Sequence, residues 1–101
     1  LLSVKLYYNL GTYRGNNYEA AVVTARNALK DYPYTEYKEE FEILILRSRY
    51  QEALHSVDEK KRERFRNVID EYYGYTNDFP EGKYIKEANK IFDVAQKYVT
   101  D

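Results

Sequence analysis

A dense group of carboxylates is the first set of side chains that could do chemistry: Glu36, Glu39, Glu40 and Glu42 lie within seven residues. Acid–base catalysis by paired carboxylates needs a pocket in which the surroundings push the two pKa values apart. Glu36 and Glu39 fall where the first turn of a helix is expected, and the helix dipole favours acidic residues there. We therefore interpret these glutamates as structural and predict no catalytic residue among them.

Nucleophilic and metal chemistry have equally little support in the chain. His55 is the only histidine and there is no cysteine, so disulfides, zinc–thiolate sites and thiol catalysis are excluded. A lone histidine at the end of a helix interacts favourably with the helix dipole when it is charged, but it makes neither a metal site nor a catalytic triad. Because no P-loop, HExxH motif or dinucleotide-binding loop occurs either, we predict no enzymatic activity, no cofactor and no metal.

A basic run, KKRERFR at residues 60–66, could in principle bind phosphate groups. Glu63 interrupts the run, Asp58 and Glu59 precede it, and the formal net charge of the chain is −1. We interpret the run as the solvated face of a helix and predict no nucleic-acid partner. No apolar stretch approaches the ~20 residues that a membrane span requires.

Tyrosine is unusually frequent: the 101-residue chain contains thirteen tyrosines and is 17% aromatic. Tyrosine suits thin cores because its ring packs while its hydroxyl stays in water. Successive helical residues point about 100° apart, so one of Tyr7 and Tyr8, and Tyr73 in the YYGY stretch at residues 72–75, should reach a second surface. Packing between helical units is the favoured role of Tyr73, and partner binding is the alternative.

Helical periodicity runs through almost the whole chain, with no alternating stretch that indicates a sheet. A tight turn is expected at residues 15–17, and the Ser56–Glu59 segment fits a capping box that starts the fourth helix. Single apolar stripes indicate one buried face for the second, fourth and fifth helices, with residues such as Tyr32 and Tyr98 among the buried ones. The helices are expected over residues 3–14, 18–31, 36–55, 57–76 and 83–99.

The helix expected at residues 36–55 differs because it carries two apolar stripes on opposite flanks, one through Phe41 and Leu44 and one through Ile43 and Leu46. Such a helix needs neighbours on both sides and is therefore an interior layer of a stack. Polar residues line the two edges between the stripes, one edge with Glu36, Glu40, Arg47 and Gln51 and the other with Lys38, Glu42 and Arg49. Either the first or the second edge is expected to line the concave face of a solenoid. The candidate partner-binding residues are taken from both edges and from Tyr73, and they are Lys38, Glu42, Arg47, Arg49, Gln51 and Tyr73.

The same short pattern occurs twice, as DYPYTEY at residues 31–37 and DFPEGKY at residues 78–84; we call these segments the first and second joints. Pro33 and Pro80 lie 47 residues apart, and each forces the preceding helix to end. Tyr37 and Tyr84 follow four residues later, where each is expected to fix the next helix. Helical hairpins that repeat in this way predict an all-α, tetratricopeptide-like α-solenoid in a single domain over residues 1–101. The expected units are residues 1–33 and 34–80, followed by a terminal capping helix at 83–100.

Local tetratricopeptide character is clearest in NYEAA at residues 17–21, followed by Ala25, Ala28 and Pro33. More specifically, the stretch from LYYNLGTYRGNNYEAA to DYPYTEYKEE, the helix with ILILRSRY, and IDEYYGYTNDFPEGKYIKEA resemble the carboxy-terminal repeats of the BamD family of outer-membrane assembly lipoproteins. The resemblance covers nearly the whole chain. Since the chain lacks methionine and opens within a pattern, we interpret it as a fragment of a longer protein.

Membership of this family would imply a non-catalytic scaffold on the periplasmic side of the outer membrane, where a complex assembles β-barrel proteins. The resemblance also implies protein partners such as BamA, and a membrane association only through a lipid anchor that lies outside this fragment. A generic tetratricopeptide peptide-binding adaptor, unrelated to barrel assembly, is the alternative. A small helical enzyme is the third hypothesis, and no catalytic motif supports it.

Overall fold

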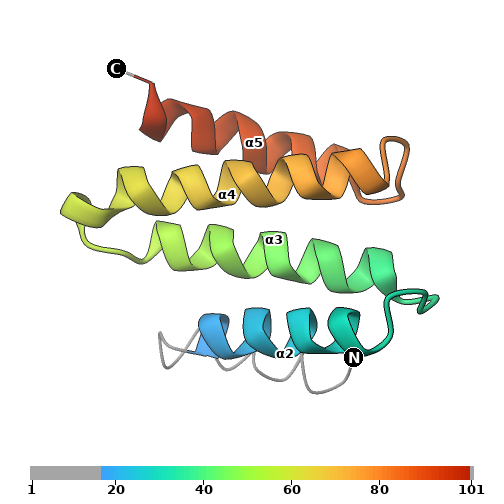
Figure 1. The fold of residues 1–101 in the computed structure, drawn as a ribbon. Helices are drawn as coiled ribbons and strands as arrows, with labels where there is room; N and C mark the ends of the chain where they lie inside the picture. Colours follow the sequence, from blue (N-terminus) through green and yellow to red (C-terminus); the bar gives the residue numbers. More distant parts are fainter. Residues whose placement is uncertain (1–16, 101) are drawn as a thin grey trace.

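The computed structural model describes residues 17–100, which form four α-helices that together hold 81% of these residues (Figure 1). No strand occurs among residues 17–100, so the described part is all-α as predicted. No helix in this range is both long enough and apolar enough to cross a membrane. The expected helix at residues 3–14, with Tyr7 and Tyr8, and most of the turn at 15–17 lie outside the described residues. The helices are α2 (Asn17–Asp31), α3 (Lys38–Leu54), α4 (Asp58–Asp78) and α5 (Ile85–Val99).

The start of α4 differs from the predicted capping box. Val57, in an extended conformation, is the N-cap residue, and no side chain caps the helix there. The Ser56 hydroxyl instead donates a hydrogen bond of 2.6 Å to the carbonyl of Ala53, at the end of α3. The prediction of Ser56 as N-cap was therefore wrong, because its hydroxyl bonds back to a carbonyl in the last turn of the preceding helix and not to an amide of α4.

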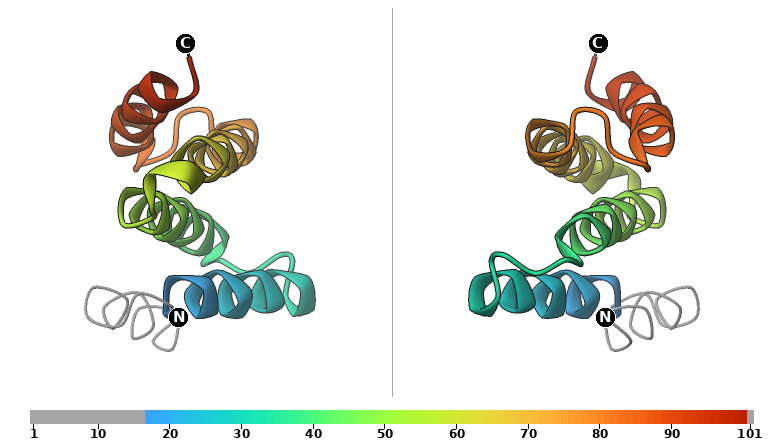
Figure 2. Two further views of the ribbon diagram at one scale, coloured as in Figure 1. Left: turned by 90° about the vertical axis from the view of Figure 1, so that its left-hand side faces the viewer. Right: turned by 90° about the vertical axis from the view of Figure 1, so that its right-hand side faces the viewer.

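The four helices follow one another in a zigzag. Figure 2, turned by 90° from Figure 1, shows α2 and α4 towards one side of the stack and α3 and α5 towards the other. Each helix packs against the next one in the chain, and α3 also touches α5. Among the described helices, α2 and α4 approach each other only through side chains, which leaves a wedge between them.

Helix α3 separates two apolar clusters, as its two stripes predicted. Phe41, Leu44 and Ile45 pack with Ala21, Val22 and Ala25 of α2 in one cluster. Ile43, Leu46 and Ala53 belong to the other cluster, which α4 and α5 complete with Phe65, Val68, Tyr75, Ala88, Ile91 and Ala95. Because both flanks are buried, α3 is an interior layer of the described stack.

Two tyrosines that were expected on buried stripes are exposed. Tyr32 is 71% exposed because α2 ends at Asp31 and the chain then turns away from the apolar cluster between α2 and α3. Tyr98 near the end of α5 is 42% exposed, although one face of its ring stacks on Phe65 with 4.1 Å between centroids. The prediction of burial was wrong for Tyr32 and half right for Tyr98.

The two joints have the same backbone structure. Four hydrogen bonds recur with an offset of 47 residues, and the N-cap residues Tyr37 (φ −95°, ψ 13°) and Tyr84 (φ −106°, ψ 12°) have nearly the same backbone angles. At the first joint the amide donors and carbonyl acceptors are Tyr32 to Ala28 (2.9 Å), Thr35 to Tyr32 (3.1 Å), Lys38 to Thr35 (3.2 Å) and Phe41 to Tyr37 (2.9 Å). At the second joint they are Phe79 to Tyr75 (2.8 Å), Gly82 to Phe79 (3.0 Å), Ile85 to Gly82 (3.1 Å) and Ala88 to Tyr84 (2.9 Å). The repeated sequence therefore encodes a repeated turn.

The side chains of the joints, in contrast, are not equivalent. Phe79 and Tyr84 of the second joint pack against the larger apolar cluster. Their counterparts in the first joint, Tyr32 and Tyr37, are 71% and 46% exposed. Both tyrosines were expected to fix the following helix; Tyr84 packs on the core, whereas Tyr37 is only partly covered.

Candidate functional site

One polar edge of α3 faces α5. The guanidinium of Arg47 donates two hydrogen bonds of 2.6 Å to the Glu87 carboxylate and lies 5.2 Å from the centre of the Tyr84 ring. Lys83 pairs with Glu40 across the same edge at 2.8 Å. This bidentate, partly buried arginine pair is the stronger kind of ion pair, so the edge ties α3 to the start of α5.

The opposite polar edge of α3 faces α2 and α4. Arg49 pairs with Glu19 of α2 at 2.5 Å and with Glu52 of its own helix at 3.2 Å. Lys38 lies 3.6 Å from Asp78 at the end of α4. One of these two edges was predicted to line the binding face, and both make ion pairs with neighbouring helices of the stack.

Glu42 of α3 lies in the wedge between α2 and α4. The wedge is a cavity of about 340 Å³, lined by apolar residues of α2, α3 and α4 and by four charged residues. Burial, followed by a hydrogen bond to Asp78 and the negative charge of that carboxylate, raises the pKa of Glu42 from 4.5 to about 8, against the opposing charge of Lys38. At neutral pH the Glu42 carboxyl group is therefore mostly protonated and can donate the hydrogen bond to Asp78. Arg26 and Glu71 close the wedge with an ion pair that links α2 to α4 directly.

The remaining two candidates occupy separate places. Gln51 is half-buried near the end of α3, where its backbone carbonyl accepts hydrogen bonds from the amide and the ring of His55. Tyr73 on α4 is 50% exposed, and its ring meets Tyr72 and Phe92 edge-on. The structure therefore does not bring the six candidates together in one site. Tyr73 contacts the same Phe92 ring as Tyr72 does, and half of its side chain stays exposed.

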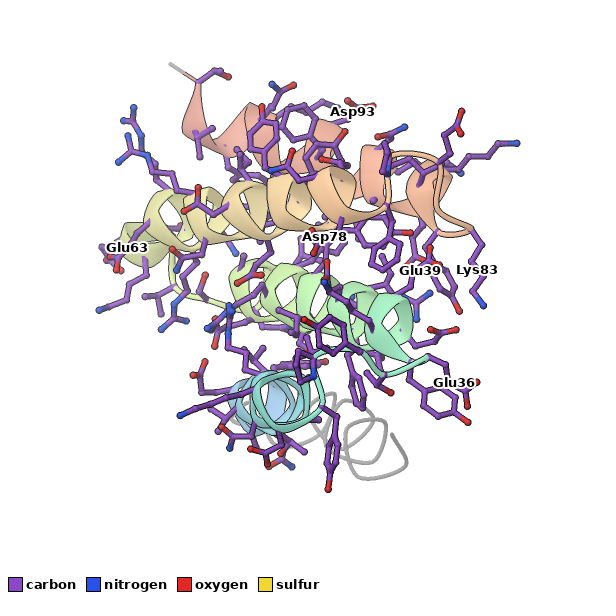
Figure 3. All side chains as sticks on the ribbon, turned by 45° about the vertical axis from the view of Figure 1, so that its right-hand side comes forward. Glu36, Glu39, Glu63, Asp78, Lys83 and Asp93 are labelled. Carbon is purple, nitrogen blue, oxygen red and sulfur yellow. The ribbon has the colours of Figure 1, made fainter. Side chains whose placement is uncertain are left out.

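A polar cluster that the sequence did not indicate closes the second joint. Glu39 of α3 accepts hydrogen bonds from the Tyr75 hydroxyl (2.7 Å) and the Lys83 amide (2.8 Å), and the Tyr84 amide donates to the Tyr75 hydroxyl (3.1 Å). In Figure 3, Glu39 and Lys83 lie next to each other at the end of the molecule that carries both joints. Burial and the bond to Glu39 raise the pKa of Tyr75, so its hydroxyl stays protonated and can donate.

Gly82 makes this cluster possible. A Cβ atom at Gly82 would lie 2.5 Å from the Tyr75 hydroxyl, 2.9 Å from the Cβ of Phe79 and even closer to the Glu39 carboxylate. At the first joint, Thr35 takes the place of Gly82 and its hydroxyl accepts a hydrogen bond of 3.2 Å from the Tyr37 amide. The two joints therefore satisfy the same amide in different ways, one from within the turn and one from a neighbouring helix.

One lysine of the basic run has a structural role. The Lys61 ammonium donates to the backbone carbonyls of Leu54 (2.8 Å) and Ser56 (3.0 Å), at the end of α3. A cation at this place bonds to carbonyls that lie past the last helical hydrogen bonds, and it interacts favourably with the dipole of α3. His55 is the C-cap residue of α3, at the helix end where it was predicted, and its ring stacks on Tyr18.

The described residues contain no group of three or more histidine, cysteine or acidic side chains that could hold a metal ion. No arrangement of a nucleophile, a base and an orienting group is present among the contacts of residues 17–100 described above. The most distinctive geometry is thus a stack of helices held by repeated joints and interhelical ion pairs. Comparison with protein-family models gives no match, and a search of curated proteins likewise finds no relative.

Proposed function

We propose that this protein is a non-catalytic protein-interaction scaffold, built as a tetratricopeptide-like α-solenoid of helical hairpins with α5 as the terminal helix. The observation that carries the proposal is the repeated joint, whose four backbone hydrogen bonds recur 47 residues along the chain. A turn that recurs with the same geometry places successive hairpins in the same relation to each other, which is how a solenoid grows.

The two-sided burial of α3 supports the same proposal. A helix that buries apolar residues against α2 on one flank and against α4 and α5 on the other is a layer of a stack. The ion pair of Arg26 with Glu71 joins α2 to α4, and that of Arg47 with Glu87 joins α3 to α5. Such links between alternate helices oppose bending of the stack, and a rigid surface loses little entropy when it binds a partner.

On the resemblance of its residues, we further propose that the chain is the carboxy-terminal part of a BamD-type lipoprotein. Its place would be the periplasmic side of the outer membrane, with other members of the barrel-assembly complex, such as BamA, as partners. The resemblance carries this part of the proposal; the described helices support only the scaffold. The binding surface would include the exposed Tyr73 and the half-buried Gln51.

A pull-down tests the family part of the proposal. The tagged full chain is incubated with detergent-solubilised outer membranes of the source organism, and the recovered proteins are identified by mass spectrometry. We expect recovery of the barrel-assembly protein, weakened in the Tyr73→Ala variant and unchanged in Val23→Ala, which alters an equally exposed residue on α2. Capture of soluble proteins alone would contradict the barrel-assembly role and favour the generic adaptor.

A further inference from the structure

The first joint exposes three tyrosines within six residues. Tyr32, Tyr34 and Tyr37 are 71%, 98% and 46% exposed. Two surface cavities of about 430 and 490 Å³ adjoin the same turn, and Pro33, Tyr34 and Thr35 line both of them. Single exposed aromatic residues are ordinary, whereas tyrosines gathered around hollows are typical of protein interfaces.

The second joint shows what covers a tyrosine at the equivalent position. There the guanidinium of Arg47 lies 5.2 Å from the centre of the Tyr84 ring, and the ammonium of Lys83 lies 5.6 Å from it. Cations are attracted to the face of an aromatic ring. Tyr37 is the equivalent residue of the first joint and has nearly the same backbone angles. No cation of residues 17–100 lies over its ring, and Glu36 stands at the position that corresponds to Lys83.

The charge of the first joint favours a cation as well. Its two ionisable residues other than tyrosine, Asp31 and Glu36, are both acidic and exposed, and neither forms an ion pair within the described part of the chain. The nearby Lys38 and Lys83 pair with Asp78 and Glu40 instead. In Figure 3, Glu36 lies at the edge of the molecule, below Glu39 and Lys83.

We infer that the first joint docks an arginine-bearing, extended segment of a partner protein, whose guanidinium groups stack on Tyr34 and Tyr37 and pair with Glu36. Arginine fits better than lysine because its planar group can stack on a ring and pair with a carboxylate at the same time. The hollow lined by Tyr32, Pro33 and Tyr34 would receive an apolar residue between the arginines. This inference rests on the proposed scaffold role but not on the barrel-assembly family.

The probe for this inference is the blocked peptide acetyl-Pro-Arg-Pro-Arg-Pro-amide, titrated into the full chain at low salt and followed by NMR. We expect saturable shifts at the ring signals of Tyr34 and Tyr37. Tyr34→Ala and Tyr37→Ala should each weaken binding about two- to fivefold, as expected for an exposed cation–π contact. Tyr98→Ala, which removes a tyrosine of α5 that is 42% exposed, is the matched control and should leave the affinity unchanged.

The same peptide with citrulline in place of arginine keeps the shape and removes the charge, and it should not bind. Equal binding of the citrulline peptide, or an unchanged affinity of Tyr34→Ala, would overturn the inference. Sedimentation of the chain alone provides a further test, since a dimer that Tyr34→Ala dissociates would make a second copy the occupant. Because peptide binding needs no membrane protein, a failed pull-down combined with peptide binding would refute only the family part of the proposed function.

Discussion

Replacing Gly82 with alanine should destabilise the fold, because the added methyl group must enter the cluster that closes the second joint. The new Cβ would lie 2.5 Å from the Tyr75 hydroxyl and 2.9 Å from the Cβ of Phe79, well inside van der Waals contact. Tyr75 and Glu39 would have to move, and the three hydrogen bonds of 2.7, 2.8 and 3.1 Å that they make with each other and with the turn would weaken or break.

The expected effect follows from these three bonds. At about 1 kcal/mol each, their loss amounts to roughly 3 kcal/mol. Alanine restricts the unfolded chain more than glycine does, which offsets about 0.7 kcal/mol of this. The free energy of unfolding should therefore fall by about 2 kcal/mol, which lowers the melting temperature by on the order of 10 °C in a domain of this size.

Gly74 provides the matched control for this experiment. It lies inside α4 and lines the wedge, and a Cβ added there meets nothing within 4 Å. Since glycine inside a helix is less stable than alanine by about 1 kcal/mol, Gly74→Ala should raise the melting temperature. Circular dichroism during heating or urea titration measures both variants. A Gly82→Ala variant as stable as the wild type, or more stable, would refute the close approach of Glu39 and Tyr75 to the turn.

Three further predictions concern single side chains. Tyr84→Ala should destabilise by about 2–3 kcal/mol because its half-buried ring packs on the core, whereas Tyr37→Ala should stay below about 1 kcal/mol, and equal urea midpoints would contradict this asymmetry. The folded-state pKa of Glu42 is raised from 4.5 to about 8. Its contribution to the free energy of unfolding should therefore be fully present below pH 4.5 and lost as the pH rises through 8. Glu42→Gln should flatten this decline, and urea unfolding at a series of pH values measures it. Lys61→Ala should lower the stability by about 1 kcal/mol while the exposed Lys60→Ala changes little, and similar melting temperatures for both would argue against the cap on α3.

The sequence was sufficient to predict features that depend on local physics. Pro33 and Pro80 stop their helices through steric effects on the preceding residue, so both helix ends and the equivalence of the joints could be predicted. The two stripes of α3 likewise follow from helical geometry alone, and the structure buries both.

Features that depend on distant neighbours could not be predicted. Glu39 and Tyr75 lie 36 positions apart, and nothing local marks Gly82 as the point where both reach the backbone. One of the two edges that carry Arg47 and Arg49 was expected to face a partner because charged edges are usually solvated, but carboxylates on α5 and α2 approach both arginines in the fold. Ser56 shows that a local pattern can also mislead when two backbone groups compete for one hydroxyl.

The repeated sequence encodes a repeated turn at the two joints, and we propose that a stack of helical units grows from this turn. NMR couplings transmitted through hydrogen bonds measure it most directly, because each coupling identifies one amide and its carbonyl acceptor. We predict couplings from Tyr32 to Ala28 and from Phe41 to Tyr37, matched by couplings of similar size from Phe79 to Tyr75 and from Ala88 to Tyr84. Couplings at one joint, with a different set of acceptors at the other, would contradict the claim.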